Sequence, residues 1–541
     1  MPAHQIQSDE TPPPLNDPLP NRFSNIQARA FRRTILSSER QSVSQCLLDA
    51  ETDLKVYQAE IDRLKAKIMV LETRRDGLKE RITKYRSLMS PVHRMPPEIL
   101  THILSFCCEN VLQPGTLQLA VLALSSVCGR WRELVLATPR FWSSLTIMLH
   151  EWANKKDTGI SSSDRHNFYH CTEMFMQRSK TELLALEFFS YYDHPFEPLE
   201  AGLNCLLDQS HRWRSVTVGI RRDPHVIGTS SSPFQRLRGR LPNLRHLALE
   251  YYEECAEDWI TSDMNLFSAC PSLTSLKLMA DLVPTSTIFP WEQMHSLQLC
   301  VDSSHDALIR TIKLCKNLQQ LKLAYVDHPS ESTIGPITPL NEMQHLYVNH
   351  VEDNGSFLFD SFSLPALSSL QIDGHHYVTH MDVGPLTGFL LRSSCSITSL
   401  LLSEVGLYGT QMFDLLTLMP TLVKLSIHER VIHYEIMARG VTATFLEQLV
   451  MNVGDEQAAC FLPRLEDLTL TIEPLESSSR QTLQRVLASR NALLRIFTPT
   501  VRNLKAEMDV ADYELLRCFR AVGMRVSVSC QIRVFRRRIP E

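Results

Sequence analysis

The chain has 541 residues, too many for one compact core, so we expect two or more domains or one elongated repeat array. Hydrophobic residues make up 44% and charged residues 21%, a composition that supports a sizeable core and excludes a wholly disordered chain. The formal net charge of -5 predicts affinity for neither nucleic acid nor a membrane surface.

No targeting or membrane segment is expected. The N-terminus lacks the basic and apolar regions of a signal peptide, and no apolar run approaches ~18 residues without a charge. The 14 cysteines are scattered, without Cys-x-x-Cys pairs, and we interpret them as small buried side chains. These features predict a location in the cytoplasm, the nucleus or both.

Residues 1–42 are predicted to be a disordered arm, because prolines interrupt helical and ladder hydrogen bonding at Pro12, Pro13, Pro14, Pro18 and Pro20. The arm is locally basic, and so is the other end of the chain, Arg533–Arg538. A solvated tail is the simpler interpretation of both segments. The alternatives are a localisation or binding signal in the arm, and a nuclear address or acidic partner for the C-terminal segment.

Residues 43–89 follow a heptad pattern. Position a holds Leu47, Leu54, Ile61, Ile68, Arg75 and Ile82, and position d holds Ala50, Tyr57, Leu64, Leu71, Leu78 and Tyr85. Sustained 3-4 spacing of apolar residues predicts a coiled coil, and about 40 residues of helix would extend about 60 Å.

Two arrangements of this helix stay open. In a parallel homodimer, Glu60 would face Lys65 and Lys67 would face Glu72, whereas Arg74 and Lys79 would repel and the C-terminal end would fray. The alternative is an amphipathic helix that folds back on its own chain.

Residues 90–146 are predicted to hold two short apolar helices. The heptads end at Ser90-Pro91, and Met95-Pro96-Pro97-Glu98 begins a new helix, with proline and a carboxylate suited to its first turn. A second helix is expected from Leu122 to Leu134, and Thr138-Pro139 ends it.

This segment resembles an F-box, the short helical motif of ubiquitin-ligase substrate receptors. The residues that carry the resemblance are Met95-Pro96-x-Glu98-Ile99-Leu100-x-x-Ile103-Leu104, Val127-Cys128-x-x-Trp131-Arg132-x-Leu134 and Pro139-x-x-Trp142. Together with the preceding heptads they are similar to the large fungal sets of F-box proteins. The resemblance implies docking onto the Skp-type adaptor of a Skp–cullin–F-box ubiquitin ligase, through Pro96, Ile99, Leu100, Ile103, Leu104, Leu124, Val127, Cys128 and Trp131.

The segment departs from the family pattern in two places. Met95 replaces a usual leucine, and Cys107–Leu119 is a longer insert that lacks the usual Asp-Leu pair. The alternative to an adaptor interface is a self-contained helical bundle packed on the next domain.

A repeated Leu-x-x-Leu-x-Leu pattern begins after Trp142. Units open at Leu244, Leu273, Met294, Leu318, Met343, Leu367, Ile397, Leu422, Leu446 and Leu465, with weaker copies at Leu183 and Trp213. The spacing resembles irregular leucine-rich repeats without an asparagine ladder, each unit a strand plus a helix. We expect a linking segment and first irregular repeats at 147–240, and a solenoid with a C-terminal cap at 241–541. The cap is predicted to be a helix at Asp512–Phe519 followed by an alternating strand at Met524–Cys530. The alternative is a layered α/β domain.

Polar residues between the leucines are expected on the exposed concave face of the strands. They are Arg245, His246, Thr274, Ser275, Gln319, Gln320, Gln344, His345, Ser368 and Ser369. Their variety suits recognition of a protein more than catalysis.

No catalytic or cofactor motif stands out. His375, His376 and His380 cluster without further ligands at metal spacing, so surface histidines are the better interpretation and no metal is expected. No phosphate-binding glycine loop, nucleophile elbow or zinc-protease helix is present, and we expect no cofactor and no enzymatic activity.

The sequence therefore predicts a mixed α and α/β fold: a coiled-coil helix, a small helical F-box and a leucine-rich-repeat-like solenoid. The predicted function is a non-enzymatic substrate receptor, whose F-box binds the adaptor and whose repeats bind a target protein for ubiquitination. The alternative is an interaction scaffold with no ligase, and a hydrolase is a distant third. Neither the target nor the repeat number can be deduced from these motifs.

Overall fold

The structure is a computed structural model of the whole chain. It describes residues 37–113, 118–149, 162–190, 199–220, 233–251, 265–280, 289–301, 305–324, 337–349, 356–374, 381–407, 409–428, 443–450, 461–472, 477–490, 494–501, 525–526 and 529–530. The chain divides into two units, residues 1–100 and 101–541, which are described separately. Three predicted features lie outside the described residues. They are the surface histidines His375, His376 and His380, the basic C-terminal segment, and most of the arm.

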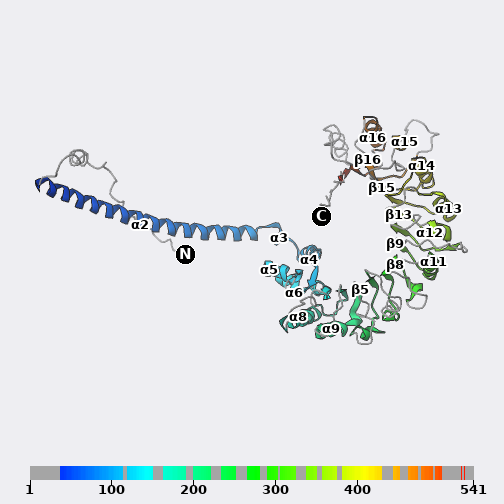
Figure 1. The fold of residues 1–541 in the computed structure, drawn as a ribbon, viewed down its shortest axis with the longest axis horizontal. Coiled ribbons are helices and arrows are strands. Elements are labelled where there is room, and N and C mark those ends of the chain that lie inside the picture. The colour runs from blue at the N-terminus through cyan, green and yellow to red at the C-terminus, as the bar shows by residue number, and fades with distance from the viewer. Residues whose placement is uncertain are drawn as a thin grey trace, which may run out of the picture. The chain divides into compact units, whose positions relative to one another are not determined.

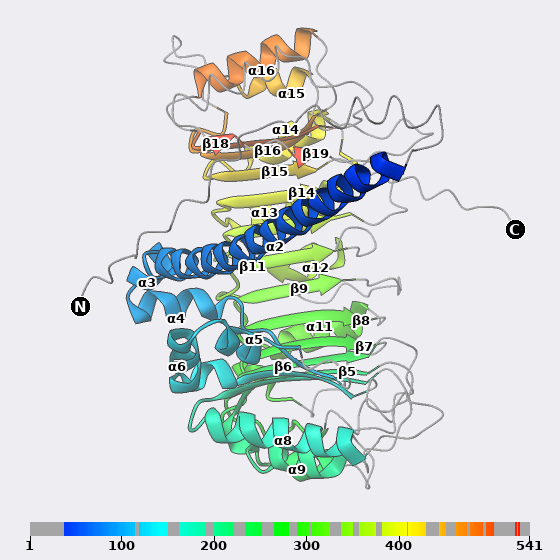
Figure 2. The ribbon, with the colours of Figure 1, turned by 90° about the vertical axis from the view of Figure 1, so that its left-hand side faces the viewer.

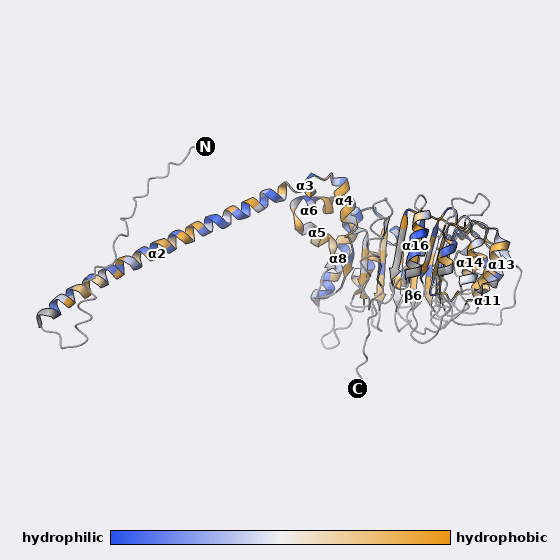
Figure 3. Ribbon diagram, turned by 90° about the horizontal axis from the view of Figure 1, so that it is seen from above, coloured by the Kyte–Doolittle hydropathy of each residue, from blue (hydrophilic) through white to orange (hydrophobic). Residues whose placement is uncertain are grey.

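Residues Ser37–Leu88 form one unbroken helix, α2, of 52 residues (Figure 1), which is about 78 Å long. It begins within the segment that composition assigned to the arm, and it ends just before the predicted Ser90-Pro91 boundary. The ribbon coloured by hydropathy shows hydrophobic residues alternating with hydrophilic ones along the helix (Figure 3). The long helix is as expected, whereas its pairing into a coiled coil stays a prediction.

Short helices follow α2, and the first begins where the prolines require. Ser90 is extended, as the residue before a proline prefers, and α3 spans Pro91–Arg94. Helix α4 spans Pro97–Ser105 with Glu98 in its first turn, as the sequence predicted.

The expected second helix is two helices, so the prediction of a single one is wrong. Helix α5 spans Ala120–Val127 and α6 spans Gly129–Ala137, while Cys128 between them is extended at φ -160° and ψ 169°. Thr138 ends α6, as predicted, and a 3-10 turn, η1, covers Pro139–Trp142.

The insert at 107–119 contains paired strands. Strand β1 (Asn110–Leu112) pairs antiparallel with β2 (Gln118–Leu119), and it pairs in parallel with β3 (Ser144–Met148). The insert thus supplies the first parallel strand of a long sheet, a strand that no pattern in the insert predicts.

The sheet continues from β3 in chain order, each strand parallel to the next (Figure 2). The strands are β4 (Leu184–Ser190), β5 (Trp213–Ile220), β6 (His246–Tyr251), β7 (Ser275–Ala280), β8 (Ser296–Val301), β9 (Gln320–Ala324), β11 (His345–Asn349), β13 (Ser369–Asp373), β14 (Ser399–Ser403), β15 (Lys424–His428), β16 (Asp467–Ile472) and β17 (Ile496–Val501). Residues 147–240 therefore contribute strands to the same sheet as the later repeats. A separate pair joins β10 (Thr338–Pro339) to β12 (Phe362–Ser363).

Helices and 3-10 turns occupy the crossovers that parallel strands require. They are α8 (Ser162–Arg178), α9 (Glu200–Leu207), η3 (Ser210–Arg212), η5 (Pro233–Leu237), η6 (Trp291–Gln293), α11 (His305–Leu314), α12 (Ser356–Ser361), α13 (Gly384–Ser393), α14 (Gly409–Thr417), α15 (Ala443–Gln448) and α16 (Ser477–Ser489). Within residues 101–541 these helices lie on the outer side and the strands on the inner side (Figure 1). The arrangement is α/β and solenoid-like.

The leucines of the repeated pattern form the core between strands and helices. Leu247 and Leu249 of β6 are buried and lie in register with buried Leu276 and Leu278 of β7. The same two rows continue along the sheet, because side chains alternate between its faces.

One repeat is assigned wrongly by the pattern. The unit that opens at Leu446 was expected to be a strand, but it lies in α15, and β15 pairs directly with β16. Phe445, Leu446 and Leu449 are buried there. A three-residue interval between leucines is compatible with a helix as well as with a strand, so the interval alone does not identify either.

The C-terminal cap is partly described. Strands β18 (Arg525–Val526) and β19 (Ser529–Cys530) both pair in parallel with β17, where the sequence predicted an alternating strand. The helix expected at Asp512–Phe519 lies outside the described residues.

Arginine side chains join neighbouring crossovers. Arg490, just after α16, is 1% exposed and donates hydrogen bonds to the carbonyl oxygens of Leu449 at 2.5 Å, Leu462 at 2.8 Å and Phe461. Arg212 is also buried and donates to the Glu182 carbonyl and the Ser179 hydroxyl, and burial lowers the pKa of its guanidinium. These guanidinium groups satisfy turn carbonyls that would otherwise be buried without donors.

Among the described helices, none is long and apolar enough to cross a membrane. The expectation of buried cysteines is met only in part: of the nine cysteines whose side chains the structure describes, Cys171, Cys270 and Cys315 are buried, five are half-buried and Cys107 is exposed. Burial raises the pKa of both Cys270 and Cys315 to about 12, so these thiols stay protonated and chemically inert.

Candidate functional site

Helix α4 has one buried and one exposed apolar face. Leu100 and Leu104, one turn apart, are both 2% exposed, so they are core side chains of the folded chain. Ile99 and Ile103, also one turn apart, are exposed. Phe106 continues the exposed face just beyond the helix and is 75% exposed.

Apolar side chains are also exposed on α5. Leu122 and Val127 are exposed, whereas Val121 is fully buried. We use the name α4–α5 face for the exposed apolar side chains of the two helices and of Phe106 just after α4, namely Ile99, Ile103, Phe106, Leu122 and Val127. Ile99, Ile103 and Phe106 recur at intervals of four and three residues, and exposed apolar side chains at this spacing are typical of a helix-mediated protein interface.

The extended residue Cys128 separates α5 from α6, and the two helices pack against each other. Arg132 of α6 donates from Nε to the carbonyl oxygen of Ser125 in α5 over 3.0 Å. Cys128 and Trp131 are half-buried at this junction. Trp131 of α6 is thus partly accessible.

The second tryptophan has a different environment. Trp142 is 1% exposed and donates from Nε1 to the carbonyl oxygen of Val135 over 2.9 Å. Its ring contacts Phe175 of α8 edge-on at 5.3 Å, and the Arg178 guanidinium lies 4.7 Å from its ring centroid. Trp142 therefore anchors α6 to the first crossover helix of the sheet.

Asn110 links the hairpin to these helices. Its side-chain amide, 2% exposed, donates to the carbonyl oxygens of Phe141 at 3.1 Å and Ser144 at 3.2 Å. Its Oδ1 accepts from the backbone N–H of Val121 at 3.2 Å, which caps α5 where Leu119 offers no side-chain cap.

Helices and sheet thus form one connected body within residues 101–541. Strand β1 pairs with β3, Asn110 bonds to both strand and helix, and Trp142 packs on α8. Helices α5 and α6 are therefore held on the same frame as the inner face of the sheet.

The inner face of the sheet carries polar residues, including ones that the sequence interpretation missed. Of the ten residues predicted there, His246, Ser275, Gln320, His345 and Ser369 are the first residues of strands, and the other five each precede a strand, so strict alternation assigns only the first five to this face. The additional row is the middle residue of each Leu-x-Leu, and strict alternation would have identified it. Described members of this row are Ala248, Lys277, Gln298, Lys322, Tyr347, Gln371, Leu401, Ser426 and Thr469.

Polar groups on this face pair with one another across strands. Lys277 of β7 forms an ion pair with Glu250 of β6, and Thr146 donates to Glu187 over 2.9 Å. Burial lowers the pKa of His428 on β15, with the nearby Asp373 carboxylate acting in the opposite direction. Among the described residues, no group of three or more His, Cys, Asp or Glu side chains is arranged to hold a metal ion.

The structure separates the nine predicted adaptor-facing residues by exposure. Pro96, Ile99, Ile103 and Val127 are exposed, and Leu124, Cys128 and Trp131 are half-buried. Leu100 and Leu104 are buried. Phe106 and Leu122 were not among the nine. The sequence could have identified Phe106, because Ile99, Ile103 and Phe106 follow one another at intervals of four and three residues, which places them on one side of a helix.

Comparison with known proteins agrees with the motif. Residues 92–148 match the family model of F-box-like domains. No curated protein matches the chain. The chain thus carries an F-box-like domain, which supports an F-box protein, a class whose members are typically non-catalytic substrate-recognition subunits of ubiquitin ligases.

Proposed function

We propose that the chain is a non-catalytic substrate receptor of a Skp–cullin–F-box ubiquitin ligase, active in the cytoplasm, the nucleus or both. The observation that carries the proposal is the F-box-like domain at 92–148 with its exposed α4–α5 face. F-box domains bind Skp-type adaptors, and apolar helical anchors of this kind suit a helix-in-groove interface. The receptor would act by holding a target near ligase subunits that perform the chemistry.

We further propose that the solenoid-like sheet is an irregular leucine-rich repeat that binds the target on its inner face. In-register buried leucines and one helix or 3-10 turn in most crossovers support this assignment. The inner face combines charged, amide, hydroxyl and aromatic side chains, which suits a protein surface as target.

Adaptor binding can be tested with the full-length chain and a purified Skp-type adaptor. Ile103→Asp places a carboxylate on the exposed face of α4 without removing a core side chain, and should weaken binding about 30-fold. Calorimetry or interferometry of the purified proteins would measure the affinity. The control is Leu391→Asp, which puts the same charge at an exposed apolar position of α13, 64% exposed against 43% for Ile103, and should leave the affinity unchanged.

Two results would count against the receptor. A wild-type chain that fails to bind the adaptor at tens of micromolar would favour the scaffold without a ligase. Equal affinities for wild type and Ile103→Asp would exclude the α4–α5 face as the interface. Deletion of 92–148 is unsuitable, because it would remove β1 and β3 from the sheet.

We also propose that α2 forms a coiled coil with a second copy of the chain. Its apolar heptad residues, from Leu47 to Tyr85, are between 45% and 67% exposed, apart from Ala50, which is half-buried. An apolar seam of this length needs a partner helix, and α2 of a second copy offers a seam of the same length and pattern.

A charged substitution at a seam position should weaken dimerisation far more than the same substitution off the seam. Leu64→Asp, at position d, should raise the dimer dissociation constant of the full-length chain about 100-fold, since each dimer would bury two carboxylates. Met69→Asp is the matched control, because Met69 is 68% exposed but lies off the seam. Sedimentation equilibrium would measure both, and a monomeric wild-type chain would refute the dimer.

A further inference from the structure

Charge is distributed unevenly along the flanks of the α2 seam. Positions e and g are the positions that contact a partner helix beside the apolar seam. In the first half of the seam they hold mainly acids, Glu51, Asp53 and Glu60, and in the second half mainly bases, Lys67, Arg74, Lys79, Arg81 and Arg86. A helix with this distribution has one acidic and one basic half.

A parallel pair of such helices would place like charges together. Arg74 would face Lys79 of the second copy, and Arg81 would face Arg86, each contact occurring twice by symmetry. Arg75 would also meet Arg75 of the second copy within the seam. The attractive contacts Glu60–Lys65 and Lys67–Glu72 would offset only part of this repulsion.

An antiparallel pair removes most of the conflict. The acidic half of each helix then faces the basic half of the other, and g faces g while e faces e. The resulting contacts are Asp53 with Arg81, Glu60 with Arg74 and Glu51 with Lys79, each occurring twice. Only Lys65 and Lys67 would meet their own copies, at the centre of the pair.

Several of these charges have no partner within their own helix. In the described part of α2, Glu51, Asp53, Arg74 and Arg81 form no ion pair, whereas Glu60 pairs with Arg63 at 2.8 Å. The Asp53–Arg81 contact would therefore form without breaking an existing pair.

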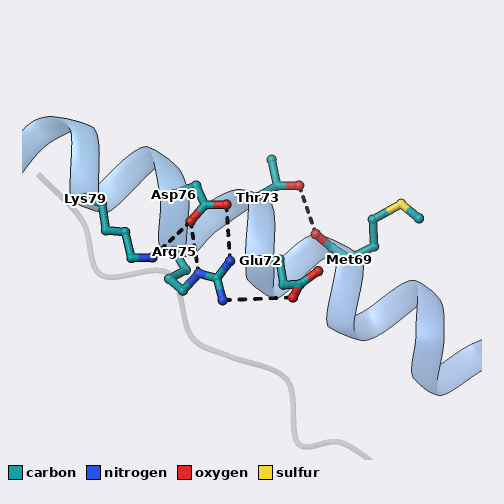
Figure 4. A network of polar contacts seen from close by, with 6 residues as sticks. All are labelled: Met69, Glu72, Thr73, Arg75, Asp76 and Lys79. Carbon is teal, nitrogen blue, oxygen red and sulfur yellow. Dashed lines mark hydrogen bonds and ion pairs between the residues drawn. The ribbon is translucent and has the colours of Figure 1, made fainter.

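The antiparallel register also accommodates the single charged residue of the seam. It places Arg75 opposite Tyr57, whose ring face attracts a guanidinium. The Arg75 guanidinium is held close to its own helix by Asp76 at 3.0 Å and Glu72 at 3.9 Å (Figure 4). The other layers pair apolar residues: Leu47 with Tyr85, Ala50 with Ile82, Leu54 with Leu78, Ile61 with Leu71 and Leu64 with Ile68.

We propose that a second copy of this chain packs antiparallel along α2, in the register that pairs Arg75 with Tyr57. The inference rests on the dimer proposed above and specifies its orientation. The seam from Leu47 to Tyr85 spans about 60 Å, so the two F-box-like domains leave the coiled coil at opposite ends. A parallel coiled coil would place them at the same end.

The first test is carbodiimide cross-linking of full-length protein, with unlabelled and isotope-labelled copies mixed so that cross-links between copies carry both labels. The antiparallel dimer should give a mixed-label amide between Glu51 and Lys79. Mixed-label Glu60–Lys65 and Lys67–Glu72 products without it would overturn the orientation but keep the dimer. Loss of all mixed-label products, with a monomeric chain in sedimentation, would overturn the dimer itself.

The second test is Asp53→Arg in the full-length chain. In the antiparallel pair this change converts two attractive contacts with Arg81 into repulsive ones, and the dimer dissociation constant should rise about tenfold. In a parallel pair Asp53 faces the neutral Gln58, so the constant would stay unchanged, which would contradict the proposal. Asp49→Arg makes the same charge change off the seam and is the control, and adding Arg81→Asp to Asp53→Arg should restore the dimer.

Discussion

Replacing Asn110 by leucine is expected to lower the free energy of unfolding of the unit at 101–541 by about 4 kcal/mol. The change removes a buried amide and leaves the Phe141 and Ser144 carbonyls and the Val121 N–H without their partner. An unpaired buried polar group costs about 1–3 kcal/mol. Urea denaturation followed by circular dichroism measures the loss in stability.

Hydrogen exchange of the backbone amides tests the same prediction at the level of individual peptides. Without Asn110, α5 loses its only side-chain cap among the described contacts, so peptides that cover Ala120–Val127 should exchange faster than those of distant strands. Asn243→Leu is the matched control, because exposed Asn243 makes a single bond to the His211 carbonyl. Equal losses of stability at both asparagines would contradict the proposed role of Asn110.

Replacing Arg490 by methionine should destabilise the C-terminal repeats by about 3 kcal/mol. Methionine fills a similar volume, but the carbonyls of Leu449, Phe461 and Leu462 lose their donor. The cost is about 1–3 kcal/mol for each unpaired group, and removal of a buried charge offsets part of it. Faster exchange in β16 and β17, ahead of the earlier strands, is the expected signature.

Arg495 provides the control for Arg490. Its side chain is 77% exposed and pairs with Glu466 at 3.2 Å on the surface, so Arg495→Met should cost at most about 1 kcal/mol. If the two substitutions destabilise the protein equally, the buried guanidinium does not hold the crossovers together.

The parts of the fold with strong local patterns could be predicted. The heptads located α2, the prolines located the start of α4, and the leucine rows located most strands of the sheet. In each case the pattern reflects burial or backbone geometry within a few residues. The start of α2 at Ser37 was missed because the boundary of the arm rested on composition alone.

Long-range contacts account for the errors. The apolar spacing from Leu122 to Leu134 continues across Cys128, so the break between α5 and α6 leaves no gap in the pattern. Strand β1 is stabilised by pairing with β3 and by Asn110, whose partners lie up to 34 residues away. Neither contact is encoded by a neighbouring motif.

The candidate docking residues were predicted by family resemblance, which does not separate core from surface. Leu100 and Leu104 match the motif as well as Ile99 and Ile103 do, yet the first two are buried and the second two are exposed. Exposure depends on which face of α4 packs inward, and only the folded chain determines that.

The pairing of β1 with β3 has a geometric consequence for a receptor of the proposed kind. Strand β1 precedes α5 and α6 and belongs to the same hydrogen-bonded sheet as the inner face. No flexible linker separates these helices from the sheet, so the span from the adaptor to a bound target would be set by secondary structure. Such a receptor would favour target lysines that lie at one fixed distance from the ligase subunits, and it would select among lysines by their position more than by the surrounding sequence.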